Sequence, residues 1–313
     1  MVTMPEAQES LEKLLDFTLS NSPLFVLTGA GCSTDSGIPD YRDHEGNWKF
    51  ARPVQYADFL SRESTRKRYW ARSMLGWPRI HGAQPNAGHL ALARLEYAGF
   101  IQQLVTQNVD GLHGKAGSRR LLDLHGNLDQ VICIDCRRRL PRAQLQEMLL
   151  SDNAGFAGDA CAAAPDGDAA AEQTDYDDFR VPGCAACNGI LKPDVVFFGE
   201  SIPRERNELA LRRLHESAAI LIIGSSLMVF SGYRFLREAA KQRKPRAAIN
   251  LGITRGDKLL DLKWQLPCSA ILDRLAECIT GMQAQNQLTG TVPRLPGVMA
   301  DTDSDACAGK QQA

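Results

Sequence analysis

The sequence lacks any long hydrophobic run. Its longest strongly apolar stretch, AAILIIG at 218–224, is far too short to cross a bilayer. It also lacks an excess of basic charge, because 36 lysines and arginines stand against 37 aspartates and glutamates, for a net charge of −1. We therefore expect neither a transmembrane segment nor a nucleic-acid or anionic-membrane partner.

The first segment lacks the features of a targeting peptide. It carries Glu6, Glu9, Glu12 and Asp16, and its first arginine is Arg42. A secretory signal combines a basic start with an apolar stretch, and a mitochondrial presequence is rich in arginine and poor in acid. These absences predict a cytoplasmic protein.

The cysteines do not suggest a disulfide framework. There are nine, an odd number, and four of them form two C-x-x-C pairs, Cys133/Cys136 and Cys184/Cys187. Without a secretion signal, paired C-x-x-C motifs indicate a metal site before they indicate disulfides. The 47 residues between the pairs exceed the usual gap of about 15–20. We predict one structural Cys₄ zinc, with no position left for a catalytic water.

Apolar runs of strand length alternate with helical patterns along much of the chain. The expected strands are 24–28, 101–106, 194–198, 218–223 and 247–251, and the expected helices are 8–20, 86–98, 203–217, 232–244 and 270–280. This alternation predicts an α/β fold, a Rossmann-like, mainly parallel sheet with helices on both faces. Polar, glycine-containing tails follow all five runs, so we expect a ligand site where the strands end.

Two stretches interrupt this alternation and predict a second, smaller module. We expect a sheet domain made of 8–42, 86–130 and 192–288, and a helical and zinc-binding module made of 43–85 and 131–191. Within the module, residues 151–178 are acidic and poor in large apolar side chains, which predicts a mobile loop. The tail 289–313 is expected to be disordered.

The segment LFVLTGAGCSTDSGIPDYR at 24–42 begins like a dinucleotide-binding loop and then departs from it. Gly29 and Gly31 would bring the backbone close to a pyrophosphate, with amides pointing inward. The third glycine of such loops is replaced by Thr34, and Pro39 favours an extended loop over a helix. The loop is thus compatible with nucleotide binding but argues against hydride transfer. The alternative is a tight turn without a ligand.

Two further segments carry candidate chemistry. Gln107, Asn108 and Asp110 follow an expected strand, where amides and a carboxylate suit ribose hydroxyls and a carboxamide, although the same residues also suit a helix-capping turn. A histidine near neutrality can take a proton from a hydroxyl. Both His125, in LDLHGN, and His113 are candidates for that role, and the residues alone do not choose between them.

Taken in order, these motifs resemble the sirtuins. The resemblance covers roughly residues 10–280 and rests on GAGCSTDSGIPDYR, TQNVDGLH, LHGN, the two C-x-x-C pairs, LKPDVVFFGE and GSSLMVFSGY. The stretches RYWARSMLGWP and KAGSRRL are most similar to class II sirtuins, the branch of the fourth mitochondrial form and its bacterial relatives. The family implies an NAD-dependent protein deacylase that consumes NAD as a co-substrate.

The resemblance also implies which residues form the site. Those implied to hold NAD are Gly29, Ala30, Gly31, Ser33, Thr34, Asp40, Tyr41, Arg42, Gln107, Asn108, Val109, Asp110, Gly224, Ser225, Ser226, Asn250, Leu251, Gly252 and Cys268. His125 is implied to be the catalytic base, acting with Asn108. By family analogy, the acyl oxygen of an acyl-lysine displaces nicotinamide, and His125 then takes a ribose hydroxyl proton. That ribose oxygen attacks the imidate carbon, and water completes the reaction, so lysine, nicotinamide and acyl-ADP-ribose are the products.

The same resemblance suggests how the substrate binds. A peptide would add as a strand beside VVFFGE, with Val196 and Phe197 lining the acyl-lysine tunnel. Tyr69 and Arg72 form a Y-x-x-R motif similar to the pair that binds acidic acyl groups, and an equally good reading is a packed tyrosine and a solvated arginine.

Two other functions fit part of the same pattern. One is a protein mono-ADP-ribosyltransferase on the same scaffold, and the other is a zinc module that senses NAD without catalysis. We expect a monomer that acts on acylated protein lysines.

Overall fold

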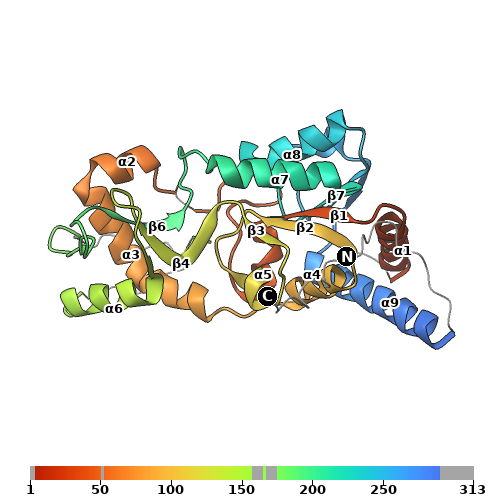
Figure 1. Cartoon of the computed structure of the whole chain (residues 1–313), viewed down its shortest axis with the longest axis horizontal. Coiled ribbons are helices and arrows are strands. Elements are labelled where there is room, and N and C mark those ends of the chain that lie inside the picture. The colour runs from red at the N-terminus through yellow and green to blue at the C-terminus, as the bar shows by residue number, and fades with distance from the viewer. Residues whose placement is uncertain (1–3, 51–52, 157–164, 167–174, 290–313) are drawn as a thin grey trace, which may run out of the picture.

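The computed structural model describes residues 4–50, 53–156, 165–166 and 175–289. Two sheets organise this part of the chain (Figure 1). The larger is a parallel six-stranded sheet, and the smaller has three antiparallel strands. The predicted α/β fold with a mainly parallel sheet is therefore confirmed.

The strand order of the larger sheet reverses at its first strand, because later strands are added on the opposite side. Its strand order is β3-β2-β1-β7-β8-β9. The strands are β1 (Leu24–Thr28), β2 (Ile101–Thr106), β3 (Leu121–Asp123), β7 (Ala219–Ile223), β8 (Arg246–Ile249) and β9 (Leu262–Trp264). The chain adds β2 and β3 on one side of β1 and then returns to add β7 on the other. Ligands of open α/β sheets bind at such a switch point, beyond the carboxyl ends of the strands.

Helices cover both faces of this sheet, which is why β1 and β7 are apolar at nearly every position. One face packs against α1 (Met4–Ser20), α4 (Ala87–Tyr97) and α9 (Cys268–Thr289), and the other against α7 (Arg204–Glu216) and α8 (Phe230–Lys241) (Figure 1). Four short helices complete the connections: η1 (Ala30–Cys32), η2 (Thr34–Ser36), α5 (Leu112–Lys115) and η3 (Asp257–Leu259).

Helix α4 shows how local sequence sets an element's ends. The Asn86 side chain accepts hydrogen bonds from the amides of Gly88 and His89, and His89 Nδ1 accepts one from the Asn86 amide. This reciprocal pair satisfies amides that the first turn leaves without partners. Beyond the helix, Gly99 takes a φ of +87°, a left-handed conformation that favours glycine. The predicted start and stop of this helix are both confirmed.

The smaller sheet organises a second cluster of elements. Its order is β5-β4-β6, with β4 (Gly126–Cys133), β5 (Arg139–Pro141) and β6 (Leu191–Val195). Three helices pack with it around a common apolar core, α2 (Tyr56–Ser61), α3 (Glu63–Gly82) and α6 (Arg142–Asp152). Trp70 in α3 is fully buried there and donates from Nε1 to the Leu191 carbonyl at 3.2 Å.

One expected strand was wrong in both position and sheet. The run at 194–198 was expected in the parallel sheet, but the strand is β6, Leu191–Val195, and it pairs antiparallel with β4. An apolar run shows that a segment is buried but does not show which strand it pairs with. The residues after β6 still reach the ligand site, because the Val196 amide donates to the His125 carbonyl at 2.7 Å.

The expected loop and tail lie largely outside the described residues. Of 151–178, α6 extends through Asp152, and Phe156 stacks on Tyr176 with ring centroids 6.3 Å apart. The predicted division into two domains stays a prediction. Among the described residues, no helix is long and apolar enough to cross a membrane.

Candidate active site

A cavity of about 830 Å³ lies where the strands of the larger sheet end, and it is bordered by residues of both sheets. This volume is in the range typical of cofactor and substrate sites, about 300–1,000 Å³. All the residues predicted to hold NAD line the cavity, as do His125, Tyr69, Val196 and Phe197. Arg72 is not among the lining residues, so the two members of the Y-x-x-R motif are placed differently.

The glycines of the first loop are required by contact between two backbone segments. A Cβ on Gly29 would lie 2.8 Å from the Gly224 carbonyl oxygen, and one on Gly224 would lie 2.4 Å from the Cys32 amide nitrogen. Gly224 also takes a φ of +58°. The loops after β1 and β7 therefore pack directly against each other at the switch point of the sheet.

This contact corrects one expectation about the loop. The amides of Gly29 and Gly31 were expected to face a pyrophosphate, but they donate to the carbonyls of Ile223 and Gly224, at 3.0 and 2.9 Å. Their hydrogen bonds are used to join the two loops. The glycines thus shape the cavity wall, and their amides are not ligand donors.

The segment from 37 to 50 covers one side of the cavity. It is not helical, as Pro39 predicts, but it is folded into turns and bends, with one antiparallel bridge between Arg42 and Trp48, and is not an extended loop. Arg42 lies over the Trp48 ring at 4.0 Å from its centroid and donates to the Gly46 carbonyl at 2.6 Å. Lys49 forms an ion pair with Asp40. The Ile253 amide donates to the His44 carbonyl at 3.0 Å, which attaches this cover to the loop after β8.

A hydrogen-bond network holds Asn108 at the cavity wall. Its amide nitrogen donates to the Gly29 carbonyl at 3.1 Å and to Ser33 Oγ at 3.0 Å. Ser33 in turn donates to Asp110 at 2.7 Å, and Asp110 accepts the Leu112 amide at 2.9 Å. The Asn108 side-chain oxygen has no partner among the described residues, so it is the group left to receive a ligand donor.

The hydrogen bonds of His125 define its tautomer. Nδ1 lies 2.8 Å from the Gln107 carbonyl oxygen, which can only accept, so Nδ1 carries the proton. Nε2 then holds the lone pair, and it lies 2.9 Å from Ser231 Oγ, which donates to it. The ring thus presents a basic nitrogen in the cavity, with its orientation set by a backbone group.

The surroundings of His125 keep it neutral. Burial is the main cause that lowers its pKa below the ordinary value, and the positive charges of Arg206 and Arg234 act in the same direction. The hydrogen bond to Gln107 opposes this shift. The imidazole is therefore an unprotonated base at neutral pH.

The structure chooses between the two histidine candidates. His113 is 1% exposed and does not line the cavity. Its Nε2 lies 2.9 Å from Thr28 Oγ1, and that hydroxyl is hydrogen-bonded to the Thr106 hydroxyl at 2.8 Å. His113 is a buried residue away from the cavity, and His125 is the histidine that lines it.

Cys32, His89 and His113 form a second cluster of potential metal ligands, all buried. The capping hydrogen bond of Asn86 occupies the lone pair on His89 Nδ1, so neutral His89 carries its proton on Nε2. A metal ligand needs a free lone pair, and His89 has none to offer. We assign this cluster to packing and not to metal binding.

The far end of the cavity is apolar and aromatic. The Phe197 ring lies 5.2 Å from Tyr69 and 5.1 Å from Phe59, measured between centroids. The buried Lys192 forms an ion pair with Glu200 at 2.9 Å, and the same carboxylate accepts the Phe197 amide at 2.9 Å. The ion pair of Lys192 and Glu200 thus holds the segment after β6 in place beside the cavity.

Sequence reasoning missed several lining residues. Ser231 and Arg234 belong to α8, which was expected to begin at 232 but begins at Phe230. Pro165 and Asp166 also line the cavity, although the sequence suggested only a loop there. Extending the expected helix at its N-terminal end, into the motif GSSLMVFSGY, would have included Ser231. No local sequence signal marks Pro165 or Asp166.

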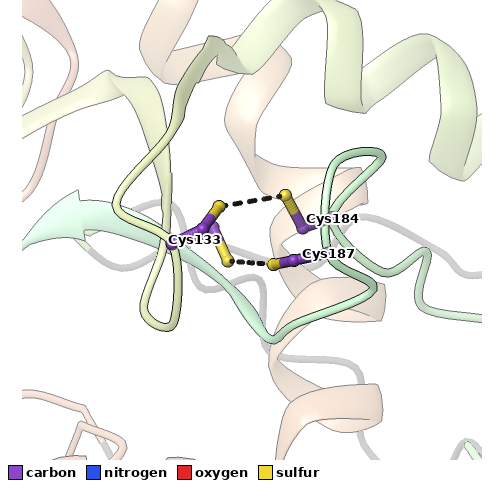
Figure 2. A group of neighbouring side chains, drawn as sticks. Cys133, Cys184 and Cys187 are labelled. Carbon is purple, nitrogen blue, oxygen red and sulfur yellow. Dashed lines mark hydrogen bonds between the residues drawn. The ribbon is translucent and has the colours of Figure 1, made fainter.

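The four predicted zinc ligands lie together in the smaller module. Their sulfur atoms are all within 4.8 Å of one another, with Cys133 and Cys187 at 3.6 Å and Cys136 and Cys184 at 3.7 Å. Figure 2 shows the side chains of Cys133, Cys184 and Cys187 turned toward one another from two separate segments. A tetrahedral zinc with bonds of about 2.3 Å requires sulfurs about 3.8 Å apart. The cluster therefore fits a structural zinc.

The two C-x-x-C turns have matching backbone geometry. The Cys133 amide donates to the Arg138 carbonyl and the Cys184 amide to the Gly189 carbonyl, both at 2.9 Å. Arg137 and Asn188 take positive φ values of 64° and 57° at equivalent positions. Each turn thus presents two sulfurs in the same way, so residues far apart in sequence form one symmetric site.

A family model described as the Sir2 family matches residues 29–231. An NAD-dependent protein deacetylase of Xanthomonas campestris pv. campestris (strain 8004) is 54% identical over 259 residues, 83% of this chain and 88% of its own length. NAD-dependent protein deacetylase 2 of Bradyrhizobium diazoefficiens is 53% identical over 272 residues, 87% of this chain and 98% of its own.

Solved structures agree with the sequence comparisons. A structure described as a Sir2–p53 peptide–NAD⁺ complex matches with a TM-score of 0.69 and 27% identity. The match covers 87% of this chain and 99% of the other.

Proposed function

The chain belongs to the Sir2 family, and on that premise we infer that it is an NAD-dependent protein deacetylase whose catalytic base is His125. The observation that carries the base assignment is the Nε2 lone pair of His125 in a cavity lined by every residue expected to hold NAD. The alternatives of an ADP-ribosyltransferase or a non-catalytic sensor are not favoured, because the curated relatives are named deacetylases.

The donors and acceptors of the cavity fit NAD. The loops after β1, β2, β7 and β8 all border it, with the hydroxyls of Ser225 and Ser226 on one wall and the free Asn108 oxygen on another. When bound, NAD supplies an electrophilic ribose carbon and nicotinamide as the leaving group. We propose that Asn108 orients the nicotinamide half and that the loops after β7 and β8 hold the adenosine half.

We propose that His125 accepts a proton from a ribose hydroxyl. Its Nδ1–H is anchored to the Gln107 carbonyl, so proton uptake at Nε2 needs no change of tautomer. A substrate hydroxyl must take the place of Ser231 as the donor to Nε2. A positioned base of this kind contributes roughly 10²–10⁴-fold to a reaction rate.

The segment after β6 suits a peptide that binds as an added strand. Among the described residues, no partner is present for the Val196 carbonyl, whereas Phe198 is already paired with Gln55 in a parallel bridge. The Val196 carbonyl therefore offers an acceptor to a substrate backbone. The apolar end of the cavity, with Tyr69 and Phe197, would take the acyl chain.

The four-cysteine zinc has a structural role in this proposal. All four positions of a tetrahedral ion are taken by sulfur, so no water can bind it. We also propose that the enzyme acts without nucleic acid, which its balanced charge supports. The monomeric state and the cytoplasmic location stay predictions.

A panel of acyl-lysine peptides, from acetyl to glutaryl, methylglutaryl and lipoyl, tests the function when incubated with labelled NAD. We expect release of nicotinamide and label in free acyl-ADP-ribose. The variant His125→Ala should lose roughly 10²–10⁴-fold in turnover while still binding NAD. Label retained on a target protein, or NAD that is left intact with every peptide, would contradict the proposal.

The same panel tests the Y-x-x-R motif. If Arg72 binds an acidic acyl group with Tyr69, Arg72→Met should weaken turnover of glutaryl-lysine and leave acetyl-lysine unaffected. Because Arg72 does not line the cavity, the motif needs this direct test. An equal effect on both peptides would leave Arg72 with a structural role only.

A further inference from the structure

An exposed phenylalanine at the mouth of the cavity is surrounded by arginines. Phe230, the first residue of α8, lines the cavity and is 46% exposed, and the preceding Val229 is 39% exposed. The guanidinium carbons of Arg234, Arg237 and Arg255 lie 5.4, 5.9 and 5.9 Å from the centre of the Phe230 ring. This group is called the Phe230 cluster below.

The charges of this cluster are not neutralised within the protein. In the part of the chain that the structure describes, Arg234, Arg237 and Arg255 form no ion pair; Arg234 donates to Asn207 and Arg255 to the Met228 carbonyl. Glu238, which lines the groove beside Arg234 and Arg237, is paired with Lys241 at 3.5 Å and His215 at 3.4 Å. Three guanidinium groups around one ring repel each other, so an anion placed among them is stabilised.

The cluster is continuous with the catalytic cavity. A shallow groove of about 190 Å³ runs along α8, lined by Asn207, Leu211, Phe230, Arg234, Arg237, Glu238 and Lys241. Phe230, Arg234 and Lys241 are spaced at helical intervals, so they share one face of α8. The groove shares Asn207, Phe230 and Arg234 with the cavity, so a chain leaving the cavity mouth can enter it directly.

We propose that the Phe230 cluster binds acidic side chains that flank the acyl-lysine of the substrate peptide. The proposal rests on the deacetylase function and names a class of substrate for it: protein segments with aspartate or glutamate close to the modified lysine. The arginines would pair with the carboxylates, and the exposed faces of Phe230 and Val229 would contact apolar parts of the same segment.

Two of the arginines separate peptide binding from NAD binding. Arg237 and Arg255 are exposed and do not line the catalytic cavity, whereas Arg234 does. Arg237 and Arg255 are therefore the residues to change. Arg212, exposed on α7 and absent from both cavities, provides a control for a change of net charge.

The test compares kcat/KM for acetyl-lysine peptides that differ only in flanking residues, with acidic, neutral or basic side chains placed in turn on each side of the lysine. For the wild-type enzyme at low ionic strength, we expect an acidic flank to raise kcat/KM by about three- to tenfold over a neutral one. The preference should fall toward onefold as salt is raised to about 1 M, where the screening length is about 3 Å.

The charge-reversal variant R237E/R255E should invert the order, so that a basic flank is favoured, while the KM for NAD and the turnover of the neutral peptide stay unchanged. The single variants R237Q and R255Q, which keep a polar side chain, should each remove part of the preference. R212E should have no effect on it. The proposal would be overturned if the wild-type enzyme showed no preference for an acidic flank. It would also be overturned if R237E/R255E left that preference intact, or if R212E changed it to the same extent. Turnover of the neutral peptide reports on the deacetylase function separately.

Discussion

At the scale of single residues, the site depends on a few atoms whose hydrogen bonds leave no choice of proton position. The Gln107 carbonyl can only accept, so it places the His125 proton on Nδ1 and the base on Nε2. The side-chain amide of Asn108 donates its two hydrogens to the Gly29 carbonyl and to Ser33 Oγ, so only its oxygen remains for a ligand. Each of these side chains is thus oriented by hydrogen bonds to neighbouring residues.

The pH dependence of the reaction should report on His125. Burial and the charges of Arg206 and Arg234 lower its pKa, and the ring must be neutral to accept a proton in the proposed role. Activity should therefore fall as pH is lowered through a midpoint below 6.5 and should stay constant between pH 7 and 8 with respect to this group. The measurement is kcat/KM against pH.

A second group near His125 titrates in the same range and needs a control. Burial raises the pKa of Asp123, two residues before His125, to about 6. In the variant Asp123→Asn, the decrease of kcat/KM at low pH that remains should be due to His125. If the decrease at low pH disappears in this variant, or if its midpoint lies above pH 6.5, His125 is not the group responsible.

At the scale of elements, the site is a contact between two loops at the switch point of the sheet. The loops after β1 and β7 are joined by the hydrogen bonds of Gly29 and Gly31, and their backbones approach so closely that side chains are excluded. Parallel pairing of β1 with β7, in register from Leu24 with Ala219 to Thr28 with Ile223, brings the two loops to the same level. The cavity wall therefore depends on strand register as well as on loop sequence.

Replacing Gly224 by alanine should damage both stability and NAD binding. The new Cβ would meet the Cys32 amide at 2.4 Å in a backbone of φ +58°. We expect a loss of more than about 1–2 kcal/mol in the free energy of unfolding, which is the cost of a left-handed residue alone, together with a raised KM for NAD. Urea denaturation and initial-rate kinetics measure the two effects.

Gly117 provides a matched control for this substitution. It also takes a positive φ, +97°, but a Cβ there would meet no atom within 4 Å. Gly117→Ala should therefore show only the backbone cost and leave the KM for NAD unchanged. Equal effects of the two substitutions would mean that the close contact between the loops does not matter.

At the scale of the whole molecule, the cavity is bordered by residues of both sheets, so its shape requires the smaller sheet to be folded. His125 directly precedes β4, and the segment after β6 hydrogen-bonds to its carbonyl. The first residue of β4, Gly126, is paired with Val195 in β6. The four cysteines lie at the other end of these strands, so a zinc ion bound there would stabilise the sheet that carries His125.

Removing one zinc ligand should unfold at least the smaller module. A structural zinc contributes about 10–16 kcal/mol of apparent binding free energy, whereas a typical domain is stable by only about 5–15 kcal/mol. Cys133→Ser should lose zinc and the fixed environment of the buried Trp70, and with them activity. Metal analysis and tryptophan fluorescence measure this.

Cys278 lies in α9, packed against the core of the larger sheet and remote from the four sulfurs, so Cys278→Ser should keep both zinc and activity. Soluble, active Cys133→Ser protein without zinc would rule out the structural role.

The sequence by itself determined the strands at 24–28 and 101–106, the capped helix at 86–98 and the family, and it predicted the NAD-holding residues that all line the cavity. These depend on local signals: apolar runs, a capping asparagine, glycine positions and cysteine spacing. Such signals involve only a few neighbouring residues, so they can be recognised in the sequence without knowing what packs against the segment.

Only the tertiary structure decided between His125 and His113, moved the strand at 194–198 into the smaller sheet, and showed that the amides of Gly29 and Gly31 bond to the protein. It also brought Arg255 to Phe230 on α8. Each of these facts depends on a partner distant in sequence. Pairing, burial and proton position follow from contacts that no local pattern specifies, because the same side chain serves either role until its neighbours are in place.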